Sequence, residues 1–209
     1  MSTVPNGLGV DKVHIWRGDR HVLKGVSLQV SPGELVHVSG ANGTGKTTLL
    51  RVITGLLQPE QGTVTWCAKA INRSRSEYQA RLAYLSHEPA LKGDLTALEN
   101  LRFSVGLKRR ATPLELYETL KRTGVAQCAQ LPARVLSAGQ RRRVAMARVL
   151  AMRASLWLLD EPFTNLDSAG AELMSQLLQA HVEEGGLAVV VAHQALQIEW
   201  PLRRLELTP

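Results

Sequence analysis

The sequence predicts an α/β protein with a parallel-sheet core, an antiparallel β part at its N-terminus and an inserted helical lobe. Three observations support this fold class. A glycine-rich loop at 40–48 lies between an apolar strand and an apolar helical period, residues 86–150 have helical spacing, and buried strands alternating with a helix follow. We expect a single domain over 1–209, with its core at about 1–85 and 151–209 and the helical lobe at about 86–150.

The N-terminal part is expected to form strands. Apolar and polar residues alternate over 10–16 and over 22–30, and a Gly-Asp-Arg turn separates the two runs, which predicts two antiparallel strands with one exposed side. Further short strands are expected at 34–39, 63–66 and 82–85, with a polar stretch at 72–79 before the last of them.

From residue 86 the pattern changes to helices, and strands return later. Helices are expected at 95–107, 113–123, 138–152 and 169–184, and buried strands at 155–160 and 187–192. Pro113 suits the first turn of its helix, because an N–H has no intrahelical partner there. Buried strands that alternate with a helix are typical of a parallel sheet covered by helices.

Composition sets only broad bounds on function. The net charge of +7 favours an anionic partner, and a bound nucleotide alone would satisfy it. Cys67 and Cys128 form no C-x-x-C pair and have no histidine at metal-ligand spacing, which favours a reduced setting with inert thiols. We expect no signal peptide, and no apolar stretch approaches the ~20 residues that span a bilayer. The chain is therefore expected to be soluble, or held at a membrane by another protein.

The loop Gly40–Thr48 matches the pattern G-x-x-x-x-G-K-[ST] in the strand–loop–helix context that binds phosphate. Backbone N–H groups can surround a triphosphate only where no Cβ intrudes, and the helix N-terminus adds its positive end. We expect Lys46 to reach the β- and γ-phosphates and Thr47 to bind Mg²⁺. The predicted ligands are ATP and Mg²⁺, and the residues expected to hold them are Gly40, Ala41, Asn42, Gly43, Thr44, Gly45, Lys46, Thr47 and Thr48.

Two carboxylates follow the apolar strand at 155–160. Chemistry in open α/β sheets takes place at the carboxyl ends of strands, beside the phosphate loop. Asp160 suits a Mg²⁺ ligand, and Glu161, one residue on, suits the general base for an attacking water.

A third motif, Leu136–Gln140, stands directly before a predicted helix. Ser137 is a good N-cap residue, and a helix start that is capped by serine and opened by Gly139 is itself an anion site. Structural capping and phosphate contact are therefore compatible interpretations of this motif.

With these three motifs in order, the chain resembles the ATP-binding-cassette ATPases over nearly its whole length. Leu136–Gln140 is similar to the family signature Leu-Ser-Gly-Gly-Gln, with Ala138 in place of a glycine. The resemblance implies that two such domains dimerise head to tail. Ser137 and Gly139 of one chain would then contact the γ-phosphate held by Lys46 of the other.

The resemblance also assigns the remaining catalytic positions. Residues 162–167 are similar to the family's D-loop, with Asp167 as its acid, and His193 resembles the histidine that senses the γ-phosphate. The implied catalytic residues are Lys46, Glu161 and His193.

Two positions depart from the family pattern or leave its assignment open. Trp16 is a candidate platform for adenine, and simple packing is the alternative, because Arg17 stands where the family's aromatic residue more often falls. His87 occupies the place of a glutamine that touches the metal and faces the membrane partner, so it is a candidate metal ligand whose charge changes near neutral pH.

Several strings narrow the resemblance to one group within the family, and they lie at 85–92, 94–101, 136–145 and 156–164. They are similar to the ATPase subunits of bacterial cytochrome c maturation systems. That similarity implies a peripheral protein on the cytoplasmic face of the inner membrane. It also implies a homodimer working with an integral membrane subunit and other cytochrome c maturation proteins, and no nucleic-acid partner. The cargo step would be haem export or release of a haem-loaded chaperone.

Three other functions share some of these motifs. An ATPase for another small cargo fits the same motifs, since fold does not name a substrate. A soluble member acting on nucleic acid usually carries two cassettes or a coiled-coil insertion, and a P-loop kinase would leave 136–140 and His193 unexplained. The basic runs at 141–143 and 108–110 are expected to be solvated faces, and contact with anionic lipid headgroups is the alternative for the second.

Overall fold

The computed structural model describes residues 7–193 and 195–208 and contains two sheets. The antiparallel sheet has the order β2-β1-β4-β5, and the parallel sheet has the order β6-β7-β8-β3-β9. The strands of the first are β1 (Leu8–Arg17), β2 (Arg20–Val30), β4 (Gln61–Trp66) and β5 (Lys69–Ala70). Those of the second are β3 (Leu35–Ser39), β6 (Leu82–Leu85), β7 (Leu156–Asp160), β8 (Leu187–Val191) and β9 (Leu202–Glu206).

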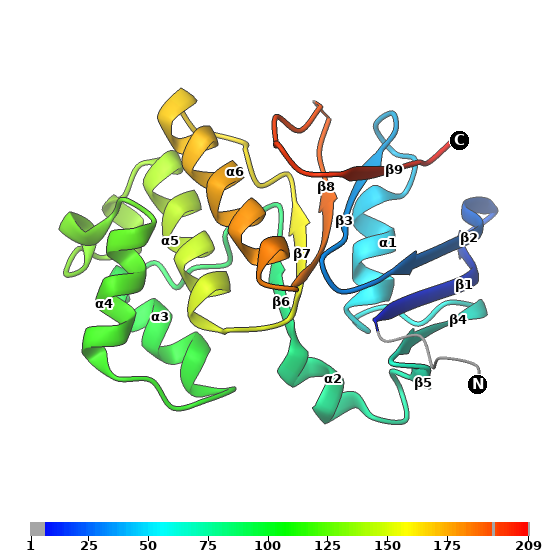
Figure 1. The fold of residues 1–209 in the computed structure, drawn as a ribbon, viewed down its shortest axis with the longest axis horizontal. Helices are drawn as coiled ribbons and strands as arrows, with labels where there is room; N and C mark the ends of the chain where they lie inside the picture. The colour runs from blue at the N-terminus through cyan, green and yellow to red at the C-terminus, as the bar shows by residue number, and fades with distance from the viewer. Residues whose placement is uncertain (1–6, 194, 209) are drawn as a thin grey trace.

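The α-helices lie on both sides of the parallel sheet, and Figure 1 shows α1 toward the antiparallel sheet and α5 and α6 on the opposite side. Their bounds are α1 (Lys46–Ile53), α2 (Arg75–Arg81), α3 (Ala97–Gly106), α4 (Pro113–Arg122), α5 (Ala138–Ala151) and α6 (Ser168–Glu183). Two short 3₁₀ turns, at Ala126–Cys128 and Ala133–Val135, lie between α4 and α5. The predicted fold class is confirmed. The sequence pattern does not predict β5, α2 or β9.

Local sequence fixes the starts of the helices in the middle of the chain. Thr96 and Glu99 form a capping box on α3, and Ser137 and Gln140 form another on α5. The Thr112 side chain caps α4, which has proline at its first position. Each cap satisfies backbone N–H groups that have no partner inside the helix.

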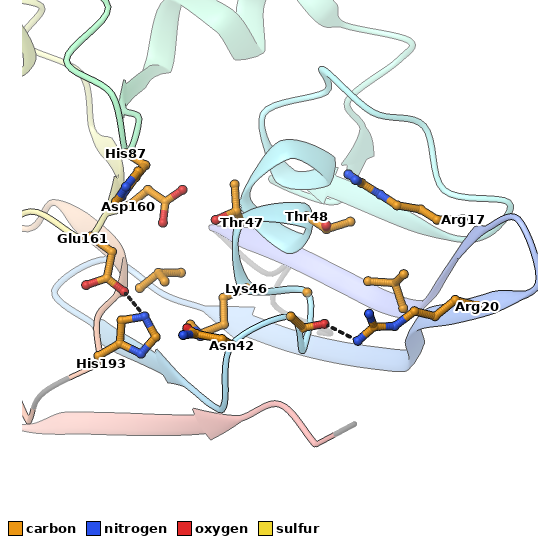
Figure 2. Close-up of a pocket in the computed structure, with 14 residues that line it drawn as sticks. Arg17, Arg20, Asn42, Lys46, Thr47, Thr48, His87, Asp160, Glu161 and His193 are labelled. Atoms are coloured by element: carbon orange, nitrogen blue, oxygen red, sulfur yellow. Dashed lines mark hydrogen bonds and ion pairs between the residues drawn. The ribbon is translucent and has the colours of Figure 1, made fainter.

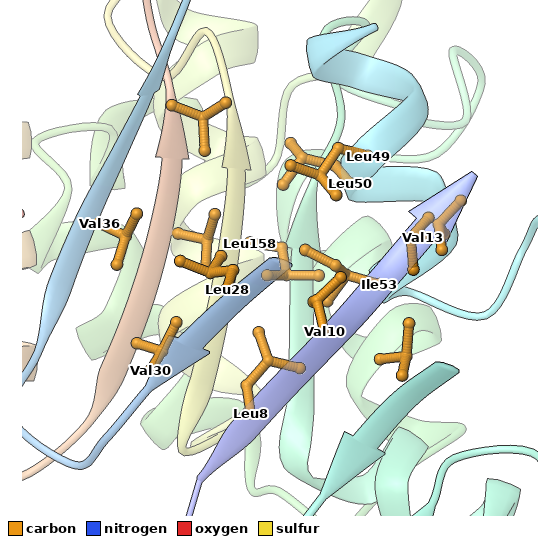
Figure 3. Close-up of a cluster of buried hydrophobic side chains, with 14 of the residues drawn as sticks. Leu8, Val10, Val13, Leu28, Val30, Val36, Leu49, Leu50, Ile53 and Leu158 are labelled. Atoms are coloured by element: carbon orange, nitrogen blue, oxygen red, sulfur yellow. The ribbon is translucent and has the colours of Figure 1, made fainter. Parts of the chain in front are cut away.

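Strand β7 divides the core into two layers. Leu156 and Leu158 pack into the cluster between the parallel sheet, α1 and the antiparallel sheet, part of which Figure 3 shows. Trp157 and Leu159 point to the opposite face and pack with residues of α5 and α6. Because both faces are covered, β7 is apolar along its whole length until it reaches Asp160.

Helix α5 joins the sheet to the helical lobe. Met146 and Val149 pack on the sheet, whereas Val144 and Ala147 pack with α3 and α4. This helix therefore packs on the sheet with one side and on the lobe with another. Within the described residues, none of the helices has the length and hydropathy that a bilayer crossing requires.

Candidate nucleotide site

A cavity of about 410 Å³ lies where β3, β7 and β8 end, and it brings together residues that are far apart in the sequence. Figure 2 shows its lining. Of the predicted site residues, those that line it are Asn42, Gly43, Gly45, Lys46, Thr47, Thr48, His87, Asp160, Glu161 and His193. Gly40, Ala41 and Thr44 belong to the same loop but do not line the cavity.

The phosphate loop is shaped by glycines and packs against β2. Gly45 has φ of 99°, and a Cβ there would lie 2.7 Å from Leu23 Cδ2 and 2.9 Å from Val22 Cγ1. Gly43 also has positive φ, at 80°, but its nearest neighbour would be Arg20 Nη2 at 3.4 Å. Gly45 is thus required by both backbone conformation and space, and Gly43 mainly by conformation.

Helix α1 begins at this loop without a side-chain cap or an acidic residue in its first turn, as far as the described residues show. Helices α3, α4, α5 and α6 each have a side-chain cap. The first N–H groups of α1 therefore remain available to an anion, and the helix dipole favours negative charge there.

Two cations neighbour the loop. Lys46 is 7% exposed, and its Nζ donates to the carbonyl oxygens of Gly40 at 2.8 Å and Ala41 at 3.0 Å. An ammonium has three N–H groups, so these two bonds leave one donor. Arg20 Nη2 donates to the Gly43 carbonyl at 2.8 Å and ties the loop to β2. No local sequence pattern indicates Arg20 as a site residue, because this contact joins residues 23 positions apart.

Asp160 is the residue best suited to hold a metal ion. It is 1% exposed, and its Oδ2 has no hydrogen-bond partner among the described residues. Figure 2 shows its carboxylate pointing toward Thr47, which opens α1. A carboxylate and a hydroxyl are the oxygen ligands that Mg²⁺ prefers, so the residues present fit this ion. His87 also lines the cavity, on the same side as Asp160.

Glu161 and His193 form a pair beside Asp160. Glu161 Oε1 lies 3.3 Å from His193 Nε2, and the carboxylate of Glu161 is only 13% exposed. The backbone of Glu161 has φ of 52°, an uncommon value for a residue other than glycine. Its N–H donates to the Val191 carbonyl at 2.9 Å, at the end of β8. A strained backbone that turns a carboxylate into a cavity is a feature of functional sites.

Three further predicted residues, outside the phosphate loop, do not line the cavity. The Trp16 ring stacks on His21, with ring centroids 4.0 Å apart and planes 8° apart, and Arg17 lines the cavity instead. Ser137 and Gly139 lie at the start of α5 and are not part of the lining within one chain.

The expectation that the basic runs are solvated was wrong for Arg142. Arg142 is 2% exposed and is bonded to backbone carbonyls. Lys108 is exposed, as expected, and its Nζ donates to the carbonyls of Gln79 and Leu82. Arg109 is partly exposed, and its Nε donates to the Ala151 carbonyl at 2.8 Å.

A signal for the burial of Arg142 was present in the sequence. Ala145, Met146 and Val149 follow it at the spacing i+3, i+4 and i+7, which places all four on one helix face. The buried side of α5 does carry this arginine together with those three apolar residues.

Comparisons with known proteins agree with this geometry. A family model described as ABC transporter matches residues 23–164. The cytochrome c biogenesis ATP-binding export protein CcmA of Methylococcus capsulatus is 45% identical over 209 residues, covering 100% of both chains. Its namesake from Nitrosococcus oceani is 47% identical over 87% of this chain and 83% of the relative. The Escherichia coli K12 protein of that name is 42% identical over 92% of each.

Solved structures show the same fold. The dimeric structure of the bacterial ABC transporter cassette MJ0796 has a TM-score of 0.85 and 28% identity, covering 95% of this chain and 94% of that one. The same cassette in a post-hydrolysis state bound to ADP and Pi has a TM-score of 0.85, with 97% of each chain covered. The chain therefore belongs to the ABC transporter family, and its curated relatives group it with the cytochrome c biogenesis ATP-binding export proteins of that family.

Proposed function

We propose that this ABC ATPase drives a membrane export complex for cytochrome c biogenesis. The cavity at the ends of β3, β7 and β8 is where it would hydrolyse ATP. The observation that carries the hydrolytic part is the convergence of a phosphate loop, a buried carboxylate with an unpartnered oxygen and a second carboxylate paired with a histidine. The names of the relatives support the biological part.

The position of each residue in the cavity determines whether it would bind phosphate or the metal ion. Lys46 exchanges its bonds to the Gly40 and Ala41 carbonyls for bonds to the β- and γ-phosphates, and the uncapped N–H groups of α1 bind the same anion. Thr47 and Asp160 would hold Mg²⁺. When bound, the ion neutralises charge that develops on the transferred phosphoryl group.

Glu161 is the proposed general base. Its carboxylate opens to the cavity and lies against His193, which holds one oxygen and leaves the other to accept a proton from the attacking water. Asp160 is less suited to that task, because it is buried more deeply and is committed to the metal. His87 lies at the metal side, where it can bind the ion directly or through water.

A second copy of the chain completes the proposed site. Ser137 and Gly139 lie outside the cavity of their own chain, at the start of a helix whose dipole favours an anion. Ser137 Oγ accepts from Gln140 N at 3.1 Å, which leaves its hydroxyl hydrogen free to donate to phosphate. The similar cassette MJ0796 has been solved as a dimer, which supports this arrangement.

We propose that the membrane subunit receives the movement that occurs when ATP brings two copies of this chain together. Large apolar side chains are exposed on the helical lobe, among them Phe103, Leu107, Leu114 and Tyr117. Such a group is suited to contact another protein. We infer, with the names of the relatives as support, that the chain works at the cytoplasmic face of the inner membrane with an integral membrane partner and other cytochrome c maturation proteins. The cargo step is haem export or release of a haem-loaded chaperone.

Complementation tests the proposed function. In a strain that lacks this gene, the wild-type chain should restore covalently haem-bearing c-type cytochromes on a haem-stained gel. Lys46→Ala and Glu161→Gln should restore less than a tenth of that signal at equal protein level. Normal cytochromes c in the deletion strain would contradict the role in biogenesis, and full restoration by both variants would contradict the need for hydrolysis.

A further inference from the structure

The side chain of Arg142 is fully used in binding backbone carbonyls. A guanidinium has five N–H donors, and each meets one carbonyl oxygen. Nη1 donates to Ser86 at 2.8 Å and to His87 at 3.1 Å. Nη2 donates to Asp160 at 2.5 Å and to Glu161, and Nε donates to Pro162 at 3.3 Å.

These acceptors belong to two loops at the same edge of the parallel sheet. The loop with Ser86 and His87 follows β6, and the loop at 160–162 ends the neighbouring strand β7. The side chains of His87, Asp160 and Glu161 line the cavity, whereas Arg142 is bonded to their backbones and does not line it. One side chain from α5 therefore holds both loops from behind the site.

Burying this cation has a cost that simple packing would avoid. Desolvation lowers the pKa of Arg142 to about 10, and the charges of Asp160, Glu161 and Tyr84 oppose this shift. An apolar residue of similar volume would fill the space without that cost. The five bonds and the nearby acids keep the side chain in its charged form at neutral pH.

We propose that Arg142 is a positioning residue for the ATPase reaction, one that sets the orientation of Glu161 and the spacing between the loop of His87 and the loop of Asp160. The inference rests on the proposed function of the cavity. The geometry that supports the inference most directly is the backbone of Glu161. Arg142 bonds the carbonyls of Asp160 and Glu161, so it holds the peptide planes on both sides of that Cα and stabilises φ at 52°.

The same helix begins at the signature motif. Ser137 is the N-cap of α5, and Arg142 follows it by five residues, or about a turn and a half. A shift of α5 along its axis is therefore passed to both loops through one rigid planar group. Contact of Ser137 with a second chain would in this way act on the position of Glu161.

Arg148 provides a matched control. It lies on the same helix, is 9% exposed, and its Nη1 donates to the Ala90 carbonyl at 2.9 Å. Burial lowers its pKa as well. It resembles Arg142 in burial and charge, but its bond reaches neither Asp160 nor Glu161.

The first measurement is steady-state hydrolysis by the full-length chain with MgATP. Arg142→Gln should lower kcat at least tenfold and change KM for ATP less than threefold, because it disturbs the base and not the phosphate loop. Arg142→Lys, whose ammonium can reach at most three of the five carbonyls, should recover part of kcat. Arg148→Gln should keep kcat within twofold. A folded Arg142→Gln chain with wild-type kcat would overturn the inference.

The second measurement does not depend on activity. Amide hydrogen exchange of the nucleotide-free chain should become at least fivefold faster in peptides covering 86–90 and 160–166 when Arg142 is replaced by lysine or glutamine. Peptides of α1 and β9 should be unchanged. Arg148→Gln should affect only the region around Ala90 and should leave 160–166 unchanged, so the peptides at 160–166 separate the two variants. A uniform increase over the whole chain would mean a general loss of stability and would overturn the positioning role.

The two proposals fail in different ways. A wild-type chain that neither binds nor hydrolyses MgATP contradicts the proposed function, whatever the exchange data show for Arg142. A wild-type chain that hydrolyses ATP, together with an unperturbed Arg142→Gln variant, contradicts only the inference about Arg142.

Discussion

Asp160 shows how one residue combines a structural cost with a function. Its carboxylate is almost completely buried, and one oxygen has no partner among the described residues. An ionised group in that position is unfavourable unless another charge or ligand compensates it. The positive charge of Arg142 behind the strand compensates part of this cost, and a cation in the cavity would compensate more.

Asp160→Asn should therefore separate metal binding from nucleotide binding. We expect the affinity for ATP in the presence of Mg²⁺ to fall at least tenfold, or by about 1.4 kcal/mol, while the affinity in EDTA stays within threefold. Titration calorimetry under both conditions measures the difference. Asp94→Asn is the control, because Asp94 is exposed and paired with Arg134. An equal loss with and without Mg²⁺ would remove Asp160 from the metal site.

His181 lies at the end of α6, and its charge is set by burial. Its ring stacks on Trp157 with centroids 3.8 Å apart, and desolvation lowers the pKa of His181 to about 4. A cation near a helix C-terminus gains about 0.3–1 kcal/mol from the helix dipole. The lowered pKa shows that desolvation outweighs that gain, so the folded protein holds this histidine neutral.

Because the pKa of His181 is lowered in the folded state, the free energy of unfolding should decrease in mild acid. Below the unfolded pKa of about 6.5 the unfolded chain binds a proton at His181 that the folded chain binds only near pH 4. From pH 6.5 to 4 the free energy of unfolding should fall by up to about 3 kcal/mol through this residue alone. His181→Phe keeps a ring against Trp157 and lacks the titration. Urea unfolding at several pH values should show the two proteins diverging by this amount, and parallel curves would contradict the assignment.

Single residues were predictable from the sequence where a local motif defines them. Lys46 and Thr47 are set by the spacing of the loop, and Asp160 and Glu161 by their place after a buried strand. Arg20 and Arg142 were not predictable in this way, because their partners lie 23 and up to 56 positions away. The proximity of Glu161 to His193 likewise depends on the pairing of β7 with β8.

At the level of elements, the phosphate loop and β2 form one unit. Gly45 lies against Leu23 and Val22, and Arg20 bonds the Gly43 carbonyl, so the loop is shaped from one side by a strand that precedes it by about twenty residues. The two glycines place different demands on this unit. At Gly45 a Cβ would meet both side chains closer than 3.0 Å, and at Gly43 it would meet only the end of a flexible arginine at 3.4 Å.

Gly45→Ala should consequently be more harmful than Gly43→Ala. Positive φ alone costs an alanine about 1 kcal/mol or more. At Gly45 the clash with β2 adds overpacking of about 1–3 kcal/mol. We expect Gly45→Ala to lower the melting temperature and to reduce MgATP affinity more than tenfold, and Gly43→Ala to have the smaller effect on stability. Thermal unfolding with and without nucleotide measures both, and equal loss of stability in the two variants would contradict the packing argument.

Elements with strong local signals were predicted well, and those held by distant contacts were missed. The starts of α3, α4 and α5 have capping residues in the sequence itself. Strand β9 has only partly buried and exposed residues and exists because it pairs in parallel with β3 across about 165 residues. Helix α2 comes from the polar stretch 72–79, and of its residues only Tyr78 is buried, with its hydroxyl donating to the Ile53 carbonyl at 2.7 Å.

In the whole molecule, the cavity and the start of α5 are two separate parts of one chain. The cavity with Lys46 lies at the ends of the parallel strands, and Ser137 caps a helix that connects the sheet to the lobe. Within the chain, Asp167 caps α6 and pairs with Arg143 at 2.7 Å, so its carboxylate already has partners in its own chain. The proposed site, which includes both Lys46 and Ser137, would therefore need a second copy of the chain.

Glu161→Gln should trap that dimer. The variant retains the phosphate loop and the metal residues but cannot accept the proton of the attacking water, so bound MgATP persists. We expect sedimentation to give a monomer without nucleotide and a dimer with saturating MgATP.

Adding Ser137→Arg, which places a long side chain at the helix start that faces the partner's phosphate, should return the protein to monomer. Thr112→Arg removes the equivalent cap of α4 and should leave the dimer intact, because that helix start has no part in the composite site. A dimer that survives Ser137→Arg would show that the two chains meet elsewhere, and a monomer at saturating MgATP would show that nucleotide alone does not bring them together.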